Sequence, residues 1–287
     1  MDYTELIEER KSTRKFQEKE VSASQIEEIK AYYSSDAKCL VSGIETELLV
    51  FGTDAREKLE GAAGYEDFMI GAPQYLVLLT QKADFALENA GYIMEDLVLK
   101  LTDMDLGSCW ITFTDSEKVK GALGIESDKD TAAIVAFGHK ARAKKRIRLN
   151  ILSMSNVDVE AKLHFNDPKK KISDMVYLNE YGNQEGLEEH IGFYEDILWE
   201  SLNAAALSPS YLNRQPYALV IKDGKIILVA EPDKYTDAID EALGLGIVML
   251  HFAGAASEFS INSAWDCDAK ADIDLPEGCR VAGVISL

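Results

Sequence analysis

Two long segments of the chain carry apolar residues at helical spacing. In the first, apolar residues recur every four positions from Ile93 to Leu101, which predicts an amphipathic or buried helix. We expect Gly107 to end this helix and the segment CWITF to form a short strand. The second segment begins at Glu241 and again predicts a long helix, followed by a turn and a tryptophan.

A shared spacing relates these two segments. Gly91 precedes Trp110 by 19 residues, and Gly246 precedes Trp265 by 19 residues. Equivalent positions of the two segments are therefore 155 residues apart. One matched spacing can arise by chance, so a duplicated chain must also repeat the elements around these helices.

The surrounding elements do repeat. Each half is predicted to contain a helix, two strands, the long helix and a closing strand, in that order. A serine caps the first of these helices. The repeated order indicates an internal duplication. The upstream helices are SASQIEEIKAYY and FYEDILWESLNAAAL, the paired strands are ELLVF with QYLVLLT and YALVI with KIILVA, and the closing strands are AAIVAFG and RVAGVISL.

Helices on the two sides of a mixed sheet, present twice, define an α+β architecture. We assign residues 1–150 to the first half and residues 187–287 to the second half. Residues 151–186 form the predicted crossover between them. The surrounding polar and basic stretch, roughly 45 residues, is too long for a simple loop. We expect it to wrap the other half or to line a site.

Charge and composition limit the partners of the chain. The formal net charge is −20, so neither nucleic acid nor an anionic membrane is expected as a partner. No stretch approaches the roughly 18 consecutive apolar residues of a membrane span. The N-terminus lacks the apolar region of a signal peptide, which favours a cytoplasmic protein. The scattered cysteines and histidines show no metal-binding spacing, and each histidine is interpreted as a surface or satisfied core residue.

Three basic clusters stand out against this acidic background: residues 10–14, 140–148 and 169–171. Charge runs usually form solvated surface. Clusters confined to the first 171 residues also suit an anion site. In the first cluster Arg10 and Arg14 flank Ser12, and guanidinium forks with a hydroxyl group match the oxygens of a phosphate. A solvated helix end is the alternative for this cluster.

A second motif, residues 208–217, contains two prolines and several hydrogen-bonding side chains, which predict a rigid loop after a helix. Ser210, Asn213 and Gln215 can present hydroxyl and amide groups to a planar heterocycle. No G-x-G-x-x-G or P-loop motif is present. The two serines of the motif have no neighbouring His/Asp pattern, so hydrolase chemistry is not expected.

These motifs resemble those of the nitroreductase-like flavoproteins. Residues 10–16, RKSTRKF, are similar to the family pattern R-R-S-x-R-x-F, with lysine at the second place. Residues 208–217 are similar to S/A-P-S-S-x-N-x-Q-P-W, with tyrosine replacing tryptophan. Residues 106–111 resemble L-G-x-x-x-W-I, and residues 169–176 resemble a late R-K-x-L-S-D-I-V segment. The resemblance covers nearly the whole chain, once in each half.

The resemblance implies one flavin mononucleotide (FMN), with NADH or NADPH as reductant. It places the phosphate or ring edge at the arginine motif, with Lys169 and Lys170 as weaker candidates. It places the flavin ring against the second motif and the flavin N5 edge near the backbone of Thr112 and Phe113, where the family often has glycine. The candidate cofactor-binding residues are Arg10, Lys11, Ser12, Arg14, Thr112, Phe113, Lys169, Lys170, Pro209, Ser210, Tyr211, Asn213 and Gln215.

Members of this family are usually homodimers with FMN at the subunit interface. Here the first half has the phosphate motif, but residues 40–47 replace its ring loop and contain Glu45 and Glu47. The second half has the ring loop but lacks the arginine motif. The resemblance therefore implies a monomer that acts as a pseudo-dimer, with one FMN site and one empty, degenerate site.

The implied reaction is a ping-pong reduction of a small-molecule acceptor, such as a nitroaromatic or a quinone. No residue is assigned as a catalytic acid, and solvent can supply protons. A non-catalytic FMN- or nucleotide-binding protein, acting as a sensor or store, is the alternative. Reductive dehalogenation or flavin destruction, as in other branches of the superfamily, is a third possibility.

Overall fold

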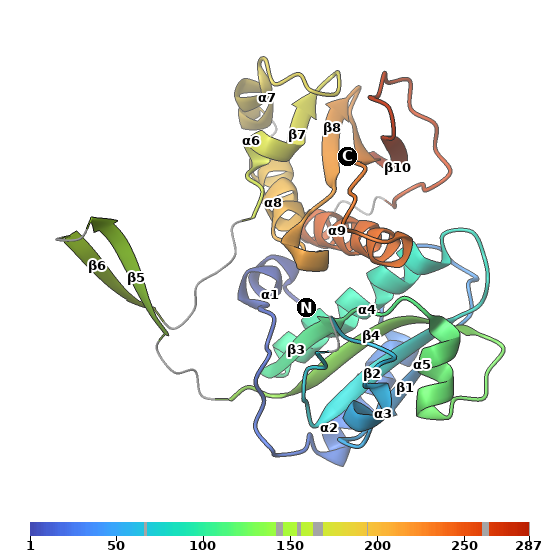
Figure 1. Cartoon of the computed structure of the whole chain (residues 1–287). Coiled ribbons are helices and arrows are strands. Elements are labelled where there is room, and N and C mark those ends of the chain that lie inside the picture. Colours follow the sequence, from blue (N-terminus) through green and yellow to red (C-terminus); the bar gives the residue numbers. More distant parts are fainter. Residues whose placement is uncertain are drawn as a thin grey trace.

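The structure of the chain is a computed structural model, and it describes residues 1–65, 68–141, 146–153, 156–162, 169–193, 195–259 and 264–286. Two sheets lie on opposite sides of a central pair of long helices (Figure 1). These helices are α4 (Ala86–Asp103) and α9 (Ala238–Glu258), and they pack directly against each other. Each sheet belongs to one half of the chain, so the predicted α+β, two-repeat fold is confirmed.

The first sheet buries both of its faces. On one face Leu76 and Leu78 pack with α4, and on the other Tyr75 and Val77 pack toward α3 and α5. This alternation follows from the period of two in a strand. All pairs between its strands are antiparallel. In spatial order the strands are β1 (Thr46–Phe51), β2 (Gln74–Thr80), β4 (Asp130–His139) and β3 (Leu106–Ile111), and the flanking helices are α2 (Ala23–Ser35), α3 (Ala55–Leu59) and α5 (Ser116–Leu123).

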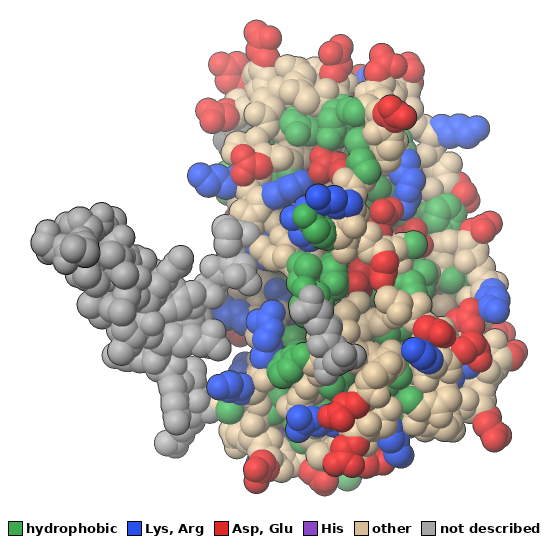
Figure 2. All heavy atoms as spheres, in the orientation of Figure 1, with side chains coloured by type: hydrophobic (Ala, Val, Ile, Leu, Met, Phe, Trp, Pro, Cys, Tyr) green, Lys and Arg blue, Asp and Glu red, His purple; other side chains and the backbone are tan. Residues whose placement is uncertain are grey.

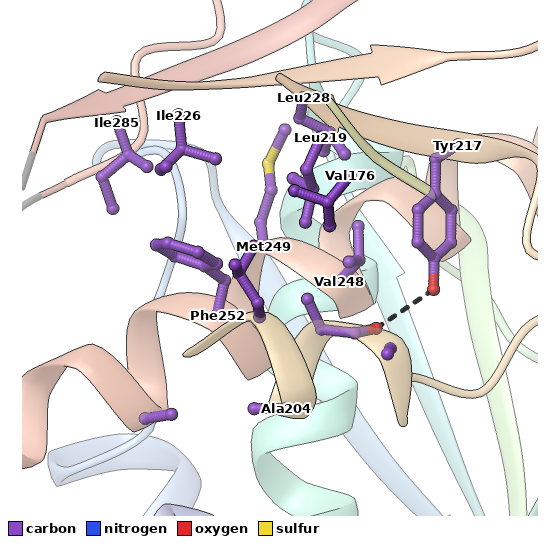
Figure 3. Close-up of a cluster of buried hydrophobic side chains, with 14 of the residues drawn as sticks. Val176, Ala204, Tyr217, Leu219, Ile226, Leu228, Val248, Met249, Phe252 and Ile285 are labelled. Atoms are coloured by element: carbon purple, nitrogen blue, oxygen red, sulfur yellow. Dashed lines mark hydrogen bonds between the residues drawn. The ribbon is translucent and has the colours of Figure 1, made fainter. Parts of the chain in front are cut away.

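The second sheet packs on α9. Figure 3 shows Leu219, Ile226 and Leu228 pointing from the strands toward Met249 and Phe252 of the helix. This sheet is mixed, because β7 runs parallel to β8 while the other pairs are antiparallel. In spatial order the strands are β10 (Arg280–Ser286), β9 (Lys225–Ala230), β8 (Tyr217–Lys222) and β7 (Val176–Leu178). The neighbouring helices are α1 (Tyr3–Glu9), α7 (Leu187–Phe193) and α8 (Glu195–Ala206).

Most of the predicted elements are confirmed, but the predicted boundary between α4 and β3 is wrong, and the strand predicted at residues 109–113 is β3 at Leu106–Ile111. Ser22 caps α2 in a capping box with Gln25. The helix α4 ends at Asp103, before the predicted stop at Gly107, and Asp105 supplies the left-handed turn (φ 54°). Gly107 instead lies inside β3. It is a close-approach glycine, since a Cβ there would stand 2.6 Å from Thr13 Oγ1.

Within the described residues of the second half, an isolated bridge marks the place equivalent to β3. Asp266, next to Trp265, forms an isolated antiparallel bridge with Val284 of β10. In the first half the corresponding tryptophan, Trp110, pairs with Val135 of β4. Both tryptophans therefore lie beside the closing strand of their own sheet, as the matched spacing predicts.

The predicted crossover contains regular structure. A hairpin of β5 (Arg146–Ser153) and β6 (Asn156–Lys162) projects from the body of the protein (Figure 1). The short helix α6 (Ile172–Met175) follows, and then β7 joins the sheet of the second half. In this stretch β7 pairs with β8 of the second half. That the stretch wraps the other half or lines a site stays a prediction. The boundaries of the halves stay a prediction.

Among the described helices, α9 is long and apolar enough to cross a membrane, by length and composition alone. Most of its residues are buried inside the protein, between α4 and α8. Its apolar surface is therefore explained by packing, as in the core helix of a soluble protein.

Candidate functional site

The arginine motif follows α1 as an extended segment along the edge of β3. Arg10 caps the helix with extended backbone angles (φ −58°, ψ 123°). Two residues later Ser12 forms a parallel bridge with Ser108 of β3, and the amide of Thr13 donates to the Ser108 carbonyl at 2.7 Å. The absent side chain of Gly107 leaves room for Thr13. The segment can therefore lie against this strand edge because residue 107 is a glycine.

Alternate residues of an extended segment share a side. Arg10, Ser12 and Arg14 therefore face one way, and their surroundings agree. Burial raises the pKa of the Cys109 thiol, while the charges of Arg14 and Arg10 and a hydrogen bond with Ser12 oppose that shift. Ser12 thus contacts Cys109, with the charges of Arg10 and Arg14 nearby. Lys11 points to the other side of the segment, and Lys11, Ser12 and Arg14 are all exposed.

The second motif is a loop held by its own side chains. Ser210 Oγ accepts a hydrogen bond from the amide of Gln215 at 2.9 Å. Leu212 and Asn213, in the 3-10 turn η1 (Tyr211–Asn213), and Gln215 have left-handed backbones, with φ of 46°, 57° and 49°. Left-handed backbone angles are uncommon outside glycine and persist only where the surrounding contacts hold them. Three such residues in one short loop therefore indicate a single, defined loop conformation.

The side chain of Gln215 holds the loop together through buried hydrogen bonds. Its side chain is fully buried, and its Nε2 donates to the carbonyl of Ala206 at 2.8 Å and to Tyr217 Oη at 3.1 Å. Its Oε1 accepts from the amide of Lys170 at 2.8 Å. Burial raises the pKa of the Tyr217 hydroxyl to about 12. The amide of Gln215, expected at the flavin ring, thus makes its described contacts with the protein.

The two candidate lysines brace the same loop. Lys169 Nζ donates to the carbonyl of Ser208 at 2.7 Å. Lys170 Nζ donates to the carbonyl of Tyr217 at 3.3 Å and pairs with Glu231 at 2.9 Å. These contacts tie the segment after the crossover to the ring motif. The lysines lie at the predicted ring loop, and their contact with a phosphate stays a prediction.

The loop of the second half meets the first half at the end of β3. The rings of Tyr65 and Tyr211 are 6.3 Å apart, one from each half. The amide of Gly64 donates to the carbonyl of Thr112 at 2.8 Å. Thr112 Oγ1 in turn donates to Asp240 Oδ2 of α9 at 2.7 Å. The ring loop and the predicted N5 position therefore lie at one boundary between the halves.

Two further residues lie near this contact: Asp240 in α9 of the second half, and Phe113, which follows Thr112 in the first half. Burial raises the pKa of the Asp240 carboxyl to about 6; the nearby Asp237 adds to the shift, and the hydrogen bond from Thr112 opposes it. Phe113 is only 2% exposed and packs in the core of the first half. Any contact from Phe113 to a ligand must therefore come from its backbone.

Lys and Arg side chains gather along the boundary between the halves on the side from which the hairpin projects, as Figure 2 shows. The surroundings of residues 40–47, the segment that stands in place of the ring loop in the first half, carry a different charge. A cavity of about 280 Å³ there is lined by uncharged residues, among them Tyr33, Cys39, Val41 and Ile93. Glu45 is exposed and pairs with Lys129 at 3.4 Å. The lining of this cavity therefore provides no cation for a phosphate group.

Sequence reasoning missed a buried polar cluster between the halves, formed by Glu95 and His251. Both side chains are fully buried and lie 3.0 Å apart. A signal was present for His251, which is a polar residue inside an otherwise apolar stretch of a long helix, whereas Glu95 is followed by a second acidic residue, Asp96. His251 is a core residue, as expected for the histidines, but its partner comes from the other half.

The fold is that of the nitroreductases. A putative nitroreductase from Thermotoga maritima has a similar structure, with a TM-score of 0.61 and 18% identity, over 100% of this chain and 94% of that chain. An FMN-dependent nitroreductase from Clostridium difficile matches with a TM-score of 0.43 and 21% identity, over 48% of this chain and 88% of its own. A putative NADH oxidase from Clostridium acetobutylicum matches with a TM-score of 0.43 and 19% identity, over 48% and 89%.

The family follows from the sequence as a whole. The model of the family described as "Putative TM nitroreductase" matches residues 2–256, and the chain belongs to that family. It is therefore an oxidoreductase of the nitroreductase type, which confirms the resemblance seen in the motifs. None of the curated proteins matches the chain.

Proposed function

We propose that the chain binds one FMN between its two halves and uses it to reduce a small-molecule acceptor with electrons from NADH or NADPH. One observation carries this proposal. The segment of Arg10, Ser12 and Arg14 runs along the edge of β3. Directly after that strand, the carbonyl of Thr112 accepts a hydrogen bond from Gly64. The ring of the next residue, Tyr65, lies 6.3 Å from that of Tyr211 in the Ser208–Tyr217 loop of the other half. Cationic and hydroxyl side chains thus flank a strand whose far end is near a rigid polar loop, as an anionic flavin nucleotide would require.

The residues present suit such a ligand. Arg10 Nε is buried with no hydrogen-bond partner among the described residues, and its ion-pair contact, to Glu95 Oε1, is long at 3.5 Å. Buried polar atoms are rarely left so in the absence of a ligand or water. Arg10, Ser12 and Arg14 would hold the phosphate or the anionic ring edge. Pro209, Ser210, Tyr211 and Asn213 would face the ring.

When bound, FMN would take a hydride from NAD(P)H and pass electrons to an acceptor such as a nitroaromatic or a quinone, in a ping-pong cycle. The chain's own residues would orient the ring and limit access to it. The rings of Tyr65 and Tyr211 would border the acceptor at the boundary. We further propose that the protein works in the cytoplasm as a monomer, with its halves in place of two subunits.

Reconstitution with FMN tests the proposal. We expect a yellow protein with one FMN per chain that NADH or NADPH bleaches. Arg14→Ala in the first half and Asn213→Gly in the second should each weaken FMN binding. Glycine is chosen for Asn213 because its φ of 57° would strain other residues. Arg280→Ala, which removes an exposed arginine paired with Glu241, is the matched control.

Three outcomes would change the proposal. Two FMN per chain would contradict the single site. Colourless protein that takes up no flavin would contradict FMN binding altogether. Bound FMN that NAD(P)H fails to reduce would favour the second candidate, a non-catalytic flavin-binding sensor or store. The buried Phe113 at a position where the family often has glycine is the observation that favours this second candidate.

A further inference from the structure

Glu95 of α4 is buried completely, although charged side chains seldom are unless they are paired. Its Oε2 accepts a hydrogen bond from Trp110 Nε1 at 2.7 Å. Its Oε1 lies 3.0 Å from His251 Nε2 of α9 and 3.5 Å from Arg10 Nε. The side chain of Arg10 is only 9% exposed. One carboxyl group therefore joins the arginine motif of the first half to a helix of the second.

The hydrogen-bond partner of His251 Nδ1 determines which ring nitrogen must carry a proton. Nδ1 lies 3.0 Å from the backbone carbonyl oxygen of Ala204, which can only accept a hydrogen bond. Nδ1 must therefore carry a proton. Nε2 faces an oxygen of Glu95. With no proton on either atom, two lone pairs would oppose each other in a dry interior, which native structures avoid.

We infer that Glu95 and His251 hold one proton between them, which leaves the positive charge of Arg10 uncompensated. If the proton is on His251, an imidazolium and a carboxylate cancel beside the guanidinium. If it is on Glu95, only the guanidinium is charged. Both arrangements leave one net positive charge. Without that proton, the carboxylate of Glu95 would cancel the charge of Arg10.

The Cys109 thiol also lies near Arg10, but burial raises its pKa, which favours the uncharged thiol. The neighbouring buried carboxyl, Asp96, is bound instead by the hydroxyl groups of Tyr3 and Tyr32, at 2.7 and 2.9 Å, and by the amide of Lys38. Burial raises the pKa of Asp96, and these hydrogen bonds oppose the shift. The two adjacent carboxyls of α4 thus belong to separate sets of partners.

This inference deepens the proposed function and rests on it. Arg10 belongs to the predicted flavin site, and reduced FMN gathers negative charge on its N1–C2=O edge. An uncompensated cation there would favour the reduced flavin and tighten binding of the anionic nucleotide. Glu95 and His251 are positioning residues, and the second half would thus control the charge of an arginine in the first.

Three variants of the FMN-loaded protein test the charge balance through the midpoint potential of the flavin and its dissociation constant. Glu95→Gln should leave both nearly unchanged, because its amide can accept from Trp110 and donate to His251 while the net charge stays the same. His251→Leu should make the potential more negative and weaken FMN roughly tenfold, because the carboxylate now cancels Arg10. The double variant should return both values toward wild type.

The opposite pattern would overturn the inference. If the carboxylate cancels Arg10 already in the wild type, Glu95→Gln will raise the potential and His251→Leu will leave it unchanged. A His251→Leu protein that fails to fold does not remove this test, because Glu95→Gln alone separates the two cases.

Nitrogen-15 NMR of the histidines provides a second test that needs no flavin. In the unloaded wild type at neutral pH we expect Nδ1 of His251 to carry a proton, and a second, slowly exchanging proton to be bonded to or shared with Nε2. In Glu95→Gln, Nε2 should become a plain acceptor. In the wild type, an Nε2 that neither carries a proton nor accepts one in a hydrogen bond from Glu95 would refute the shared proton. Failure to bind FMN with a normal NMR result would instead refute the proposed function alone.

Discussion

Gly91 of α4 lies against the main chain of Leu243 of α9, so closely that a Cβ at the glycine would overlap the carbonyl oxygen of the leucine. The contact recurs with the halves exchanged, since a Cβ at Gly246 would overlap the carbonyl oxygen of Glu88. Gly246 and Leu243 lie 155 residues after Gly91 and Glu88, the offset of the internal repeat. The helix pair therefore has the reciprocal contacts of a twofold dimer interface within one chain.

Alanine at either of these glycines should destabilise the protein. The neighbouring atoms are backbone, which cannot move aside as a flexible side chain would, so α4 and α9 must separate. We expect Gly91→Ala and Gly246→Ala each to lower the free energy of unfolding by about 2–3 kcal/mol or more, measured by denaturant unfolding. Gly244→Ala is the control on the same helix, because its Cβ would meet nothing within 4 Å. Equal effects at all three positions would contradict the close crossing.

Gly107→Ala should disturb the arginine motif. Its Cβ would stand 2.6–2.8 Å from the side chain of Thr13 and push the extended segment away from β3. We expect FMN affinity to fall at least tenfold, a loss of about 1.4 kcal/mol, measured by fluorescence titration. Gly121→Ala, with open space around its Cβ, should leave the affinity unchanged. Unchanged affinity in Gly107→Ala would mean that the segment does not position the ligand.

Gln215→Ala and Asn213→Gly should separate support of the loop from contact with the ring. Gln215→Ala leaves the buried carbonyl of Ala206 and the amide of Lys170 without their partners. We expect it to lower the free energy of unfolding by about 2–4 kcal/mol even without FMN, measured by thermal or denaturant unfolding. Asn213→Gly should weaken FMN with little change in the stability of the unloaded protein. A stable Gln215→Ala protein that merely loses flavin would place Gln215 at the ring instead.

Asp240→Asn should stabilise the protein in a pH-dependent way. The raised pKa, about 6 against an ordinary value of 3.8, means that the folded state binds its proton more tightly than the unfolded state. The wild type therefore loses stability as pH rises between these values, and the loss persists above them. Asparagine can still accept the hydrogen bond from Thr112. We expect a gain of about 1–3 kcal/mol at pH 7 that shrinks toward pH 5.

Denaturant unfolding of the wild type and Asp240→Asn at several pH values checks this prediction. The wild type is the control at each pH, so that other titrating groups cancel. A gain of the same size at pH 5 and pH 7 would mean that burial does not hold the proton on Asp240.

Local sequence predicted much of the fold because local rules decide it. The serine cap of α2, the apolar strands and the two long helices all follow from spacing and composition. Gly107 shows the limit of such rules. A glycine after a helical pattern suggests a stop, yet Asp105 makes the turn, and Gly107 is needed by a segment about 90 residues earlier. That requirement cannot be found by inspecting neighbours in the chain.

The candidate site divides in the same way. The motifs at residues 10–16 and 208–217 could be recognised because each is contiguous. The first runs along the edge of β3, where Arg10 reaches Glu95, and Tyr211 of the second lies beside Tyr65 of the first half. The pairing of Glu95 with His251 and of Thr112 with Asp240 could not be recognised. Each pair joins residues more than 100 positions apart, and no local pattern marks one partner for the other.

The sequence by itself determined the repeated order of elements and the membership of the family, and it predicted that each half carries one of the two motifs. Only the tertiary structure decided which side chains the two halves share. The reason is physical: a helix or strand is selected by the residues within a few positions of it, whereas a buried polar group takes whatever partner the packing of α4 against α9 supplies. His251 is a plain core histidine in the sequence, and the fold makes it the partner of Glu95.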